Sequence, residues 1–125
     1  KKERDKDYDQ HRRNKTNAAF YKTKAWVLTK EDVLVHYMYI DLYAYYHDGK
    51  LVPATMVHHI IPVSKDYTKR LDRDNLIPLS DKRHGIVHKQ MKEGREEEII
   101  QLLLEYKEKW KKKENSEVGG VVKLF

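Results

Sequence analysis

Residues 57–88 read VHHIIPVSKDYTKRLDRDNLIPLSDKRHGIVH, and the architecture that we expect follows from this segment. Its apolar, β-branched opening predicts a strand over 56–61, which a proline ends. A polar loop over 64–74 separates it from a second short strand over 75–79. Ser80 or Asp81 can then cap a helix that continues to about residue 91. The predicted order is strand, loop, strand, helix.

Four of the seven histidines lie in this segment. His84 and His88 are four residues apart on the predicted helix, so both rings project from one face and can share a metal ion. His58 and His59 are adjacent at the end of a strand, where successive side chains point to opposite sides. One of them can face the ion while the other faces a bound substrate. Three neutral imidazoles would leave coordination positions open, as a catalytic site requires.

Each histidine pair alone has a more ordinary interpretation. A pair spaced four apart is more often part of a solvated helix face, and an adjacent pair near a strand end usually has no special role. Together, however, the four histidines fall within 31 residues. Imidazole is polar and costs free energy to bury without partners, so packing alone explains such convergence poorly. We interpret the four histidines as a site.

Positive charge is concentrated in two parts of the chain. The net charge is +6, and residues 1–15 hold seven basic and four acidic side chains. Residues 58–92, which include the four histidines, hold eight basic and four acidic side chains. A local positive excess attracts polyanions, of which nucleic acid is the commonest. A solvated basic surface is the alternative that charge alone leaves open.

The flanking segments predict one domain with two appendages. Residues 1–17 read as a basic polar arm and 114–125 as a tail, which leaves a domain over 18–113 with its core motif at 56–91. Thr29 resembles the N-cap of a helix over 30–38. Apolar residues at helical spacing, with acids early and lysines late, predict a C-terminal helix over 96–113.

Composition limits the kinds of protein that the chain can be. Hydrophobic residues make up 39% and charged residues 37%, so the core is modest and a bound metal would help to stabilise it. The chain has no cysteine, which excludes disulfides and thiolate metal sites. No apolar run approaches the roughly 18–20 residues of a membrane span. We therefore expect no membrane partner and a cytoplasmic protein.

The motif formed by these residues resembles that of the HNH endonucleases. The resemblance lies in Val57–Pro62, in Leu71–Leu76 and in Lys82–His88, whose Lys-Arg-His-x-x-x-His ending is similar to that of the colicin-type DNases. Upstream, residues 20–26 look like the opening of phage-encoded HNH proteins. The resemblance implies an α+β protein with a ββα-metal (His-Me finger) core flanked by N-terminal and C-terminal helices.

The resemblance also implies a role for each matching position. His58, His84 and His88 stand where the family has its metal ligands, and His59 stands where it has its general base. Asn75 stands at the central asparagine, which braces the loop that holds the base. The implied activity is metal-dependent hydrolysis of DNA phosphodiester bonds, by nicking or by double-strand cleavage, with one divalent ion.

The chain departs from the family at one feature. Phage HNH proteins commonly hold a structural zinc with two Cys-x-x-Cys pairs, whose positions are taken here by Asp41 and Ala44 and by Ser80 and Arg83. We therefore expect no structural zinc. Nearby tyrosines could supply replacement packing, namely Tyr39, Tyr43, Tyr45 and Tyr46.

The active-site metal and the partners are less defined. Imidazole ligands favour zinc or nickel in affinity, and we expect activity with manganese or magnesium. The predicted partner is DNA, and the phage resemblance adds the large terminase subunit as a candidate. The candidate phosphate contacts are Lys65, Lys69, Arg70, Lys82, Arg83 and Lys89.

Two other functions remain open at this point. An HNH-like fold without activity would bind DNA and would not cut it when metal is added. A purely structural metal protein would be insensitive to loss of His59, because that residue is not needed as a ligand.

Overall fold

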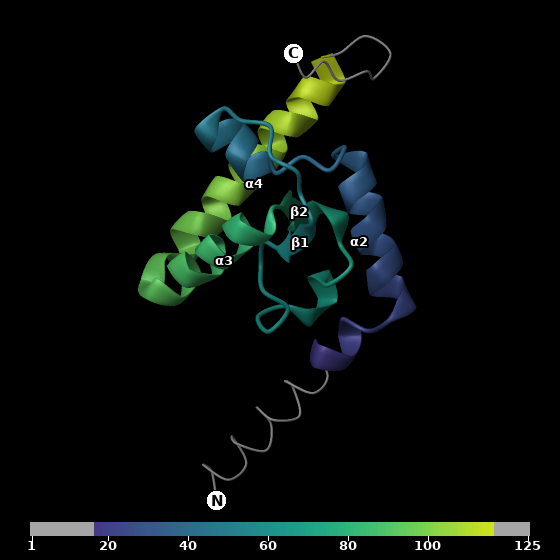
Figure 1. Ribbon diagram of the computed structural model, residues 1–125. Helices are drawn as coiled ribbons and strands as arrows, with labels where there is room; N and C mark the ends of the chain where they lie inside the picture. The colour runs from purple at the N-terminus through teal and green to yellow at the C-terminus, as the bar shows by residue number, and fades with distance from the viewer. Residues whose placement is uncertain (1–16, 117–125) are drawn as a thin grey trace, which may run out of the picture.

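The computed structural model describes residues 17–116 (Figure 1). The predicted arm, except residue 17, and most of the predicted tail lie outside this range. After a helical turn over 17–20, the main elements are α2 (Lys24–His36), β1 (Met56–His59), β2 (Leu76–Leu79), α3 (Asp81–Gln90) and α4 (Glu96–Ser116). The order strand, loop, strand, helix is confirmed, and the fold is of the expected α+β class.

The two strands form an antiparallel hairpin. Met56 lies opposite Leu79 and His59 lies opposite Leu76. One further backbone bond, from the Ile60 N–H to the Asn75 carbonyl at 2.8 Å, extends the pairing past the end of both strands. Both strands are shorter than predicted, because Ile60 and Asn75 belong to the turns that lead into and out of the intervening loop.

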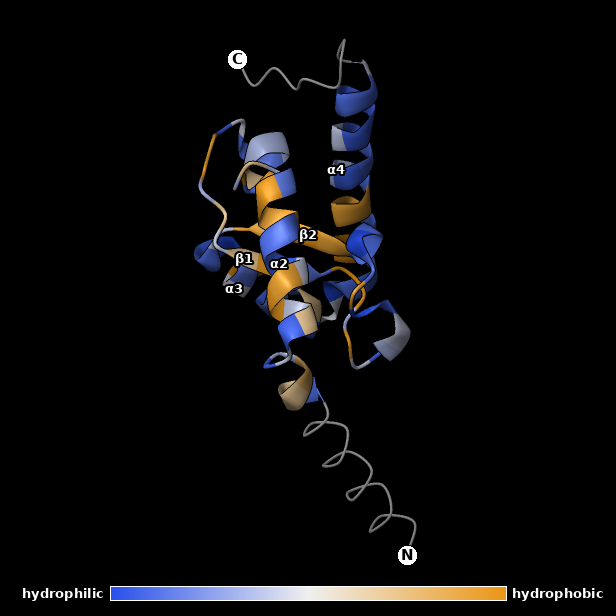
Figure 2. Cartoon of the chain, turned by 90° about the vertical axis from the view of Figure 1, so that its right-hand side faces the viewer, coloured by the Kyte–Doolittle hydropathy of each residue, from blue (hydrophilic) through white to orange (hydrophobic). Residues whose placement is uncertain are grey.

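The core forms between this hairpin and the helices. In Figure 1, α2 and α3 lie on opposite sides of the hairpin, and Figure 2 shows apolar residues on the hairpin and on α2, whereas most of α4 is hydrophilic on the side in view. The side chains with under 2% exposure include Leu42, Ile60, Leu76, Ile77, Leu79, Ile99, Leu103 and Trp110. The hairpin ends are therefore held by apolar packing on both sides.

The helix predicted over 30–38 was placed too late in the chain. α2 begins at Lys24, because the Thr23 hydroxyl accepts a hydrogen bond from the Trp26 N–H at 3.2 Å and caps the helix there. Thr29 lies inside the helix. The helix ends at His36, and Met38 and Tyr39 then adopt left-handed backbone conformations with φ of 55° and 56°.

The turn between α3 and α4 contains Gly94. A π-helical segment over Met91–Arg95 joins the two helices, and Gly94 has a φ of 89°, which glycine adopts without the steric cost that other residues incur. α4 runs to Ser116, three residues past the predicted end. Across residues 17–116, no helix is both long enough and apolar enough to span a membrane.

Hydrogen bonds join the four positions at which the phage relatives were expected to have cysteines. Asp41 is fully buried, and its carboxylate accepts bonds from the Ala44 N–H at 2.9 Å and from the Ser80 N–H at 2.8 Å. The Ser80 hydroxyl in turn accepts a bond from the Arg83 N–H and caps α3. Asp41 therefore ties the start of α3 to the segment before β1.

The tyrosines near these positions pack as expected, with one exception. Tyr43 and Tyr46 contact the ring of Tyr106, and Tyr45 contacts Trp110. Tyr39 is exposed, and its hydroxyl bonds to Glu31 on α2. Three of the four tyrosines therefore pack against residues of α4.

Candidate active site

Three histidine rings converge at the junction of β1 and α3. His58 comes from the strand, and His84 and His88 come from successive turns of the helix. Each offers a ring nitrogen, and these nitrogens all lie within 4.8 Å of one another. The ring centroid of His58 lies 5.4 Å from that of His84 and 5.2 Å from that of His88. The predicted meeting of these three side chains is confirmed.

The three side chains fit a divalent transition-metal ion. The Nε2 atoms of His84 and His88 are 3.0 Å apart, and two nitrogens bound at right angles at about 2.1 Å would be separated by about 3.0 Å. The Nε2 atom of His58 is buried and has no hydrogen-bond partner among the described residues. An unpaired buried polar atom is costly, and an ion shared with the other two rings would satisfy it.

Desolvation favours the neutral form of these rings, most strongly for the buried His58. Desolvation, with contributions from the neighbouring histidines, lowers the pKa of His58 to about 3. Desolvation also lowers the pKa of His84 and of His88. Ring nitrogens that bind a metal must carry a lone pair, so all three side chains are in a ligating form near neutral pH without having to lose a proton.

His59 lies beside this cluster, and its protonation pattern follows from one hydrogen bond. Its Nε2 atom is 2.9 Å from the carbonyl oxygen of Arg70. A carbonyl can only accept, so Nε2 must carry the hydrogen and Nδ1 has the lone pair in the neutral ring. Burial lowers the pKa of His59, and the bond to the Arg70 carbonyl partly offsets this effect. The ring is therefore neutral at physiological pH, with its free lone pair on Nδ1.

Aromatic side chains from the start of the chain surround the ring of His59. Trp26 stacks on it with centroids 4.8 Å apart and an interplanar angle of 24°. Phe20 and Tyr21 contact it edge-on, each at 6.0 Å. The sequence does not predict this stacking of Trp26, because it depends on where α2 begins.

Asn75 braces the loop that holds His59. Its Oδ1 atom accepts a bond from the Ile61 N–H at 2.8 Å, and its Nδ2 atom donates to the Ile61 carbonyl at 3.0 Å and to the Lys69 carbonyl at 3.4 Å. Lys69 precedes Arg70, whose carbonyl holds His59. The amide therefore links the end of β1 to the segment that orients the ring.

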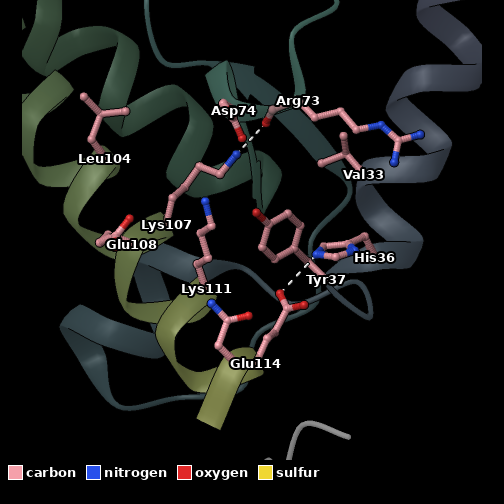
Figure 3. A pocket seen from close by; sticks show the side chains of 11 residues that line it. Val33, His36, Tyr37, Arg73, Asp74, Leu104, Lys107, Glu108, Lys111 and Glu114 are labelled. Atoms are coloured by element: carbon pink, nitrogen blue, oxygen red, sulfur yellow. Dashed lines mark hydrogen bonds and ion pairs between the residues drawn. The ribbon is translucent and has the colours of Figure 1, made fainter. Parts of the chain in front are cut away.

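The turn that carries Asn75 is also tied to α4. Figure 3 shows Lys107 of α4 reaching the carbonyl oxygen of Arg73, the first residue of the 3₁₀ turn Arg73–Asn75. Lys107 lines a cavity of about 540 Å³ between α2 and α4, together with Lys111. This bond connects the middle of α4 directly to the loop region of the site, and the pair of Lys65 with Glu96 connects the start of α4 to the same loop.

A larger cavity, of about 800 Å³, opens at the histidines. Its lining includes all four site histidines, Tyr21, Trp26 and Lys30 of the N-terminal half, and Met91, Lys92 and Glu96 after α3. It therefore joins the histidine cluster, the ring of His59 and two lysines in one space.

None of the six predicted phosphate contacts lines this cavity. Arg83 is paired with Asp48 at 2.5 Å, and Lys65 is paired with Glu96 at 2.7 Å. The guanidinium of Arg70 lies over the ring of Tyr67. The remaining three are Lys69 in a 3₁₀ turn and the exposed Lys82 and Lys89 on α3.

A two-stranded hairpin followed by a helix, with three histidines of strand and helix turned to one point, defines a ββα-metal protein. The structure is similar to the crystal structure of the HNH endonuclease of the deep-sea thermophilic bacteriophage GVE2 with manganese ion. The TM-score is 0.63 and the sequence identity is 36%. The match covers 72% of this chain and 95% of the phage chain. No protein-family model and no curated protein matches. This chain belongs to the HNH endonuclease family.

Proposed function

We propose that the protein is a metal-dependent endonuclease that hydrolyses DNA phosphodiester bonds, with His59 as the general base. The observation that supports this most is the state of His59. Its Nε2–H is engaged by a carbonyl, which leaves the lone pair on Nδ1, and the ring lines the same cavity as three histidines that fit one ion. A base and a metal-binding cluster in one cavity are what hydrolysis of a phosphodiester requires.

In this proposal, His59 removes a proton from the attacking water. A neutral imidazole with a pKa somewhat below its ordinary value can do so at physiological pH, and general-base catalysis typically contributes about 10²–10⁴ in rate. Asn75 is a positioning residue, because it holds both the strand end and the Lys69 carbonyl next to the group that orients His59.

His58, His84 and His88 would hold the divalent ion. When bound, the ion would neutralise charge on the phosphate and stabilise the departing oxygen. The manganese of the phage neighbour makes manganese the first ion to test, with magnesium second. Zinc and nickel should bind imidazole more tightly, and tight binding need not give the highest activity.

The bacteriophage origin of the neighbour also suggests a biological setting. We propose a phage-encoded enzyme that acts in the host cytoplasm. An association with the large terminase subunit rests on the family resemblance alone, and co-purification of the two proteins from infected cells would test it.

A plasmid assay tests the proposed activity. Chelated protein is mixed with supercoiled plasmid, and manganese, magnesium, zinc and nickel are added separately. We expect open-circle or linear DNA from the unmodified protein with manganese or magnesium. His59→Ala should reduce the rate by about 10²–10⁴ and retain manganese binding in calorimetry, whereas His88→Ala should lose both. His36→Ala, an exposed histidine outside the site, is the matched control.

Two outcomes would count against the proposal. Binding of DNA without cleavage in any metal would favour an inactive DNA-binding module. Equal cleavage by the unmodified protein and His59→Ala would remove His59 from the mechanism.

A further inference from the structure

Two lysines that the mechanism does not use line the active-site cavity. Lys30 lies four residues after Trp26 on α2, and Lys92 lies four residues after His88, just beyond α3. Residues four apart on a helix share a face. Trp26 stacks on His59 and His88 belongs to the histidine cluster, so each lysine is one turn, about 5.4 Å of helix, from a residue of the site.

Both lysines share this cavity with His58, His59, His84 and His88. Their side chains therefore border the space in which a phosphate would bind.

These lysines are also electrostatically available. Within residues 17–116, neither Lys30 nor Lys92 forms an ion pair with a carboxylate. Glu96 is the single acidic residue among the described residues of the lining, and it is already paired with Lys65 at 2.7 Å. In the part of the chain that the structure describes, the cavity thus holds two positive charges without a negative partner, a combination that favours a polyanion.

We propose that Lys30 and Lys92 bind the DNA phosphates that flank the cleaved phosphodiester. This inference rests on the proposed function. The cleaved phosphate would lie between His59 and the histidine cluster, where a bound divalent ion would repel an ammonium group. The flanking phosphates carry no such ion, and the long lysine side chains can reach outward to them. The cavity of about 800 Å³ has room for more than a single phosphate.

The salt dependence of DNA binding tests this proposal. Affinity for a short duplex is measured by fluorescence anisotropy at several salt concentrations, in a His59→Ala background with manganese so that the duplex stays intact. Each lost phosphate contact should reduce the slope of log K against log salt by about 0.9. The double variant Lys30→Met/Lys92→Met should therefore lower this slope by about 1.8. The reduction should be the same for duplexes of unrelated sequence. In the His59-containing enzyme, the same pair should raise KM more than it lowers kcat.

Two controls separate these lysines from the general charge of the protein. Lys112→Met removes the same charge from an exposed position on α4 and should leave the slope unchanged. Lys30→Arg with Lys92→Arg should retain the slope of the lysine protein, which also guards against misfolding. A slope for the methionine pair equal to that of Lys112→Met would overturn the proposal. A failure of the unmodified enzyme to cleave any DNA would instead count against the proposed function.

Discussion

Asn75 uses one amide to hold both main-chain polar groups of Ile61. Its oxygen accepts from the Ile61 N–H, and its nitrogen donates to the Ile61 carbonyl and to the Lys69 carbonyl. Only asparagine or glutamine offers a donor and an acceptor side by side in this way. Because Lys69 adjoins Arg70, whose carbonyl is bonded to His59, the amide links the hairpin to the proposed base.

We expect Asn75→Asp to be costly although the two side chains have nearly the same shape. A carboxylate oxygen would face the carbonyls of Ile61 and Lys69 with no hydrogen to donate, which should cost about 1–3 kcal/mol in the free energy of unfolding. kcat should fall more than KM rises, because His59 loses its fixed orientation. Urea denaturation and plasmid kinetics measure the two effects. Asp74→Asn, the reverse exchange on the exposed neighbouring residue, should change little, and equal effects of both variants would contradict this explanation.

For single residues, the sequence predicts the directions of side chains better in helices and strands than in loops. The rings of His58, His84 and His88 could be expected to meet, because their spacing on a strand and a helix sets their directions. The bond from His59 to the Arg70 carbonyl could not be predicted, because it depends on the path of an irregular loop. Arg70 was singled out for its charge, whereas its main chain makes the contact with His59.

Among the elements, α3 depends on a buried carboxylate for its position. Asp41 accepts from the Ser80 N–H and from the Ala44 N–H, and Ser80 caps the helix that presents His84 and His88. A charged acceptor satisfies these two donors where the phage relatives were expected to use a zinc site. The orientation of the helix face that carries His84 and His88 therefore depends on a residue outside the candidate site.

Asp41→Ala should lower the free energy of unfolding by about 2–4 kcal/mol, because the buried Ala44 N–H and the partly buried Ser80 N–H lose their carboxylate acceptor. Manganese affinity should fall as well, since α3 would lose its anchor. Chemical denaturation and calorimetry measure these changes. Asp48→Ala removes an acidic residue whose ion pair with Arg83 is partly exposed, and it should cost about 1 kcal/mol or less. A loss in Asp41→Ala no larger than that of Asp48→Ala would rule out the anchoring role.

α4 contacts the loop region through Lys107, and this contact can be removed separately. Lys107→Met deletes the bond to the Arg73 carbonyl, worth about 1 kcal/mol, and should lower kcat by up to about fivefold while leaving manganese binding intact. Lys111→Met removes the same charge from the same cavity and should leave kcat unaltered. If both variants lower kcat equally, the effect comes from the lost positive charge and not from the lost bond to the Arg73 carbonyl.

The helix boundaries show where the sequence is ambiguous. Thr23 and Thr29 both precede helix-forming residues, and the acidic residues Glu31 and Asp32 after Thr29 favour a helix that starts at the later threonine. The structure uses Thr23, which adds Trp26 to the helix and places it against His59. A threonine that can cap a helix is recognisable in the sequence. Which of two threonines caps the helix depends on aromatic packing that exists only in the folded chain.

For the whole molecule, the buried histidines make stability depend on pH. The pKa of His58 is about 3 in the folded chain and near its ordinary value of 6.5 when unfolded. Between these values the unfolded chain binds a proton that the folded chain does not. The metal-free protein should therefore be most stable above about pH 6.5 and should lose up to about 1.4 kcal/mol per pH unit below it for this residue.

Urea denaturation in chelator at pH 7.5, 6.5 and 5.5 measures this dependence. The lowered pKa values of His59, His84 and His88 act in the same direction, so the unmodified protein should show the steepest decline. His58→Asn should show a shallower one. Parallel declines in the two proteins would mean that His58 does not contribute.

The stacking of Trp26 on His59 gives the protein an intrinsic optical reporter. The chain has two tryptophans, and Trp110 is buried among the residues of the core, away from the cavity. Indole emission is quenched by a neighbouring imidazolium, so the fluorescence of a Trp110→Phe protein would follow the protonation of one ring at the centre of the site. Substrate arrival and base titration could thus be followed by stopped-flow without attaching a dye.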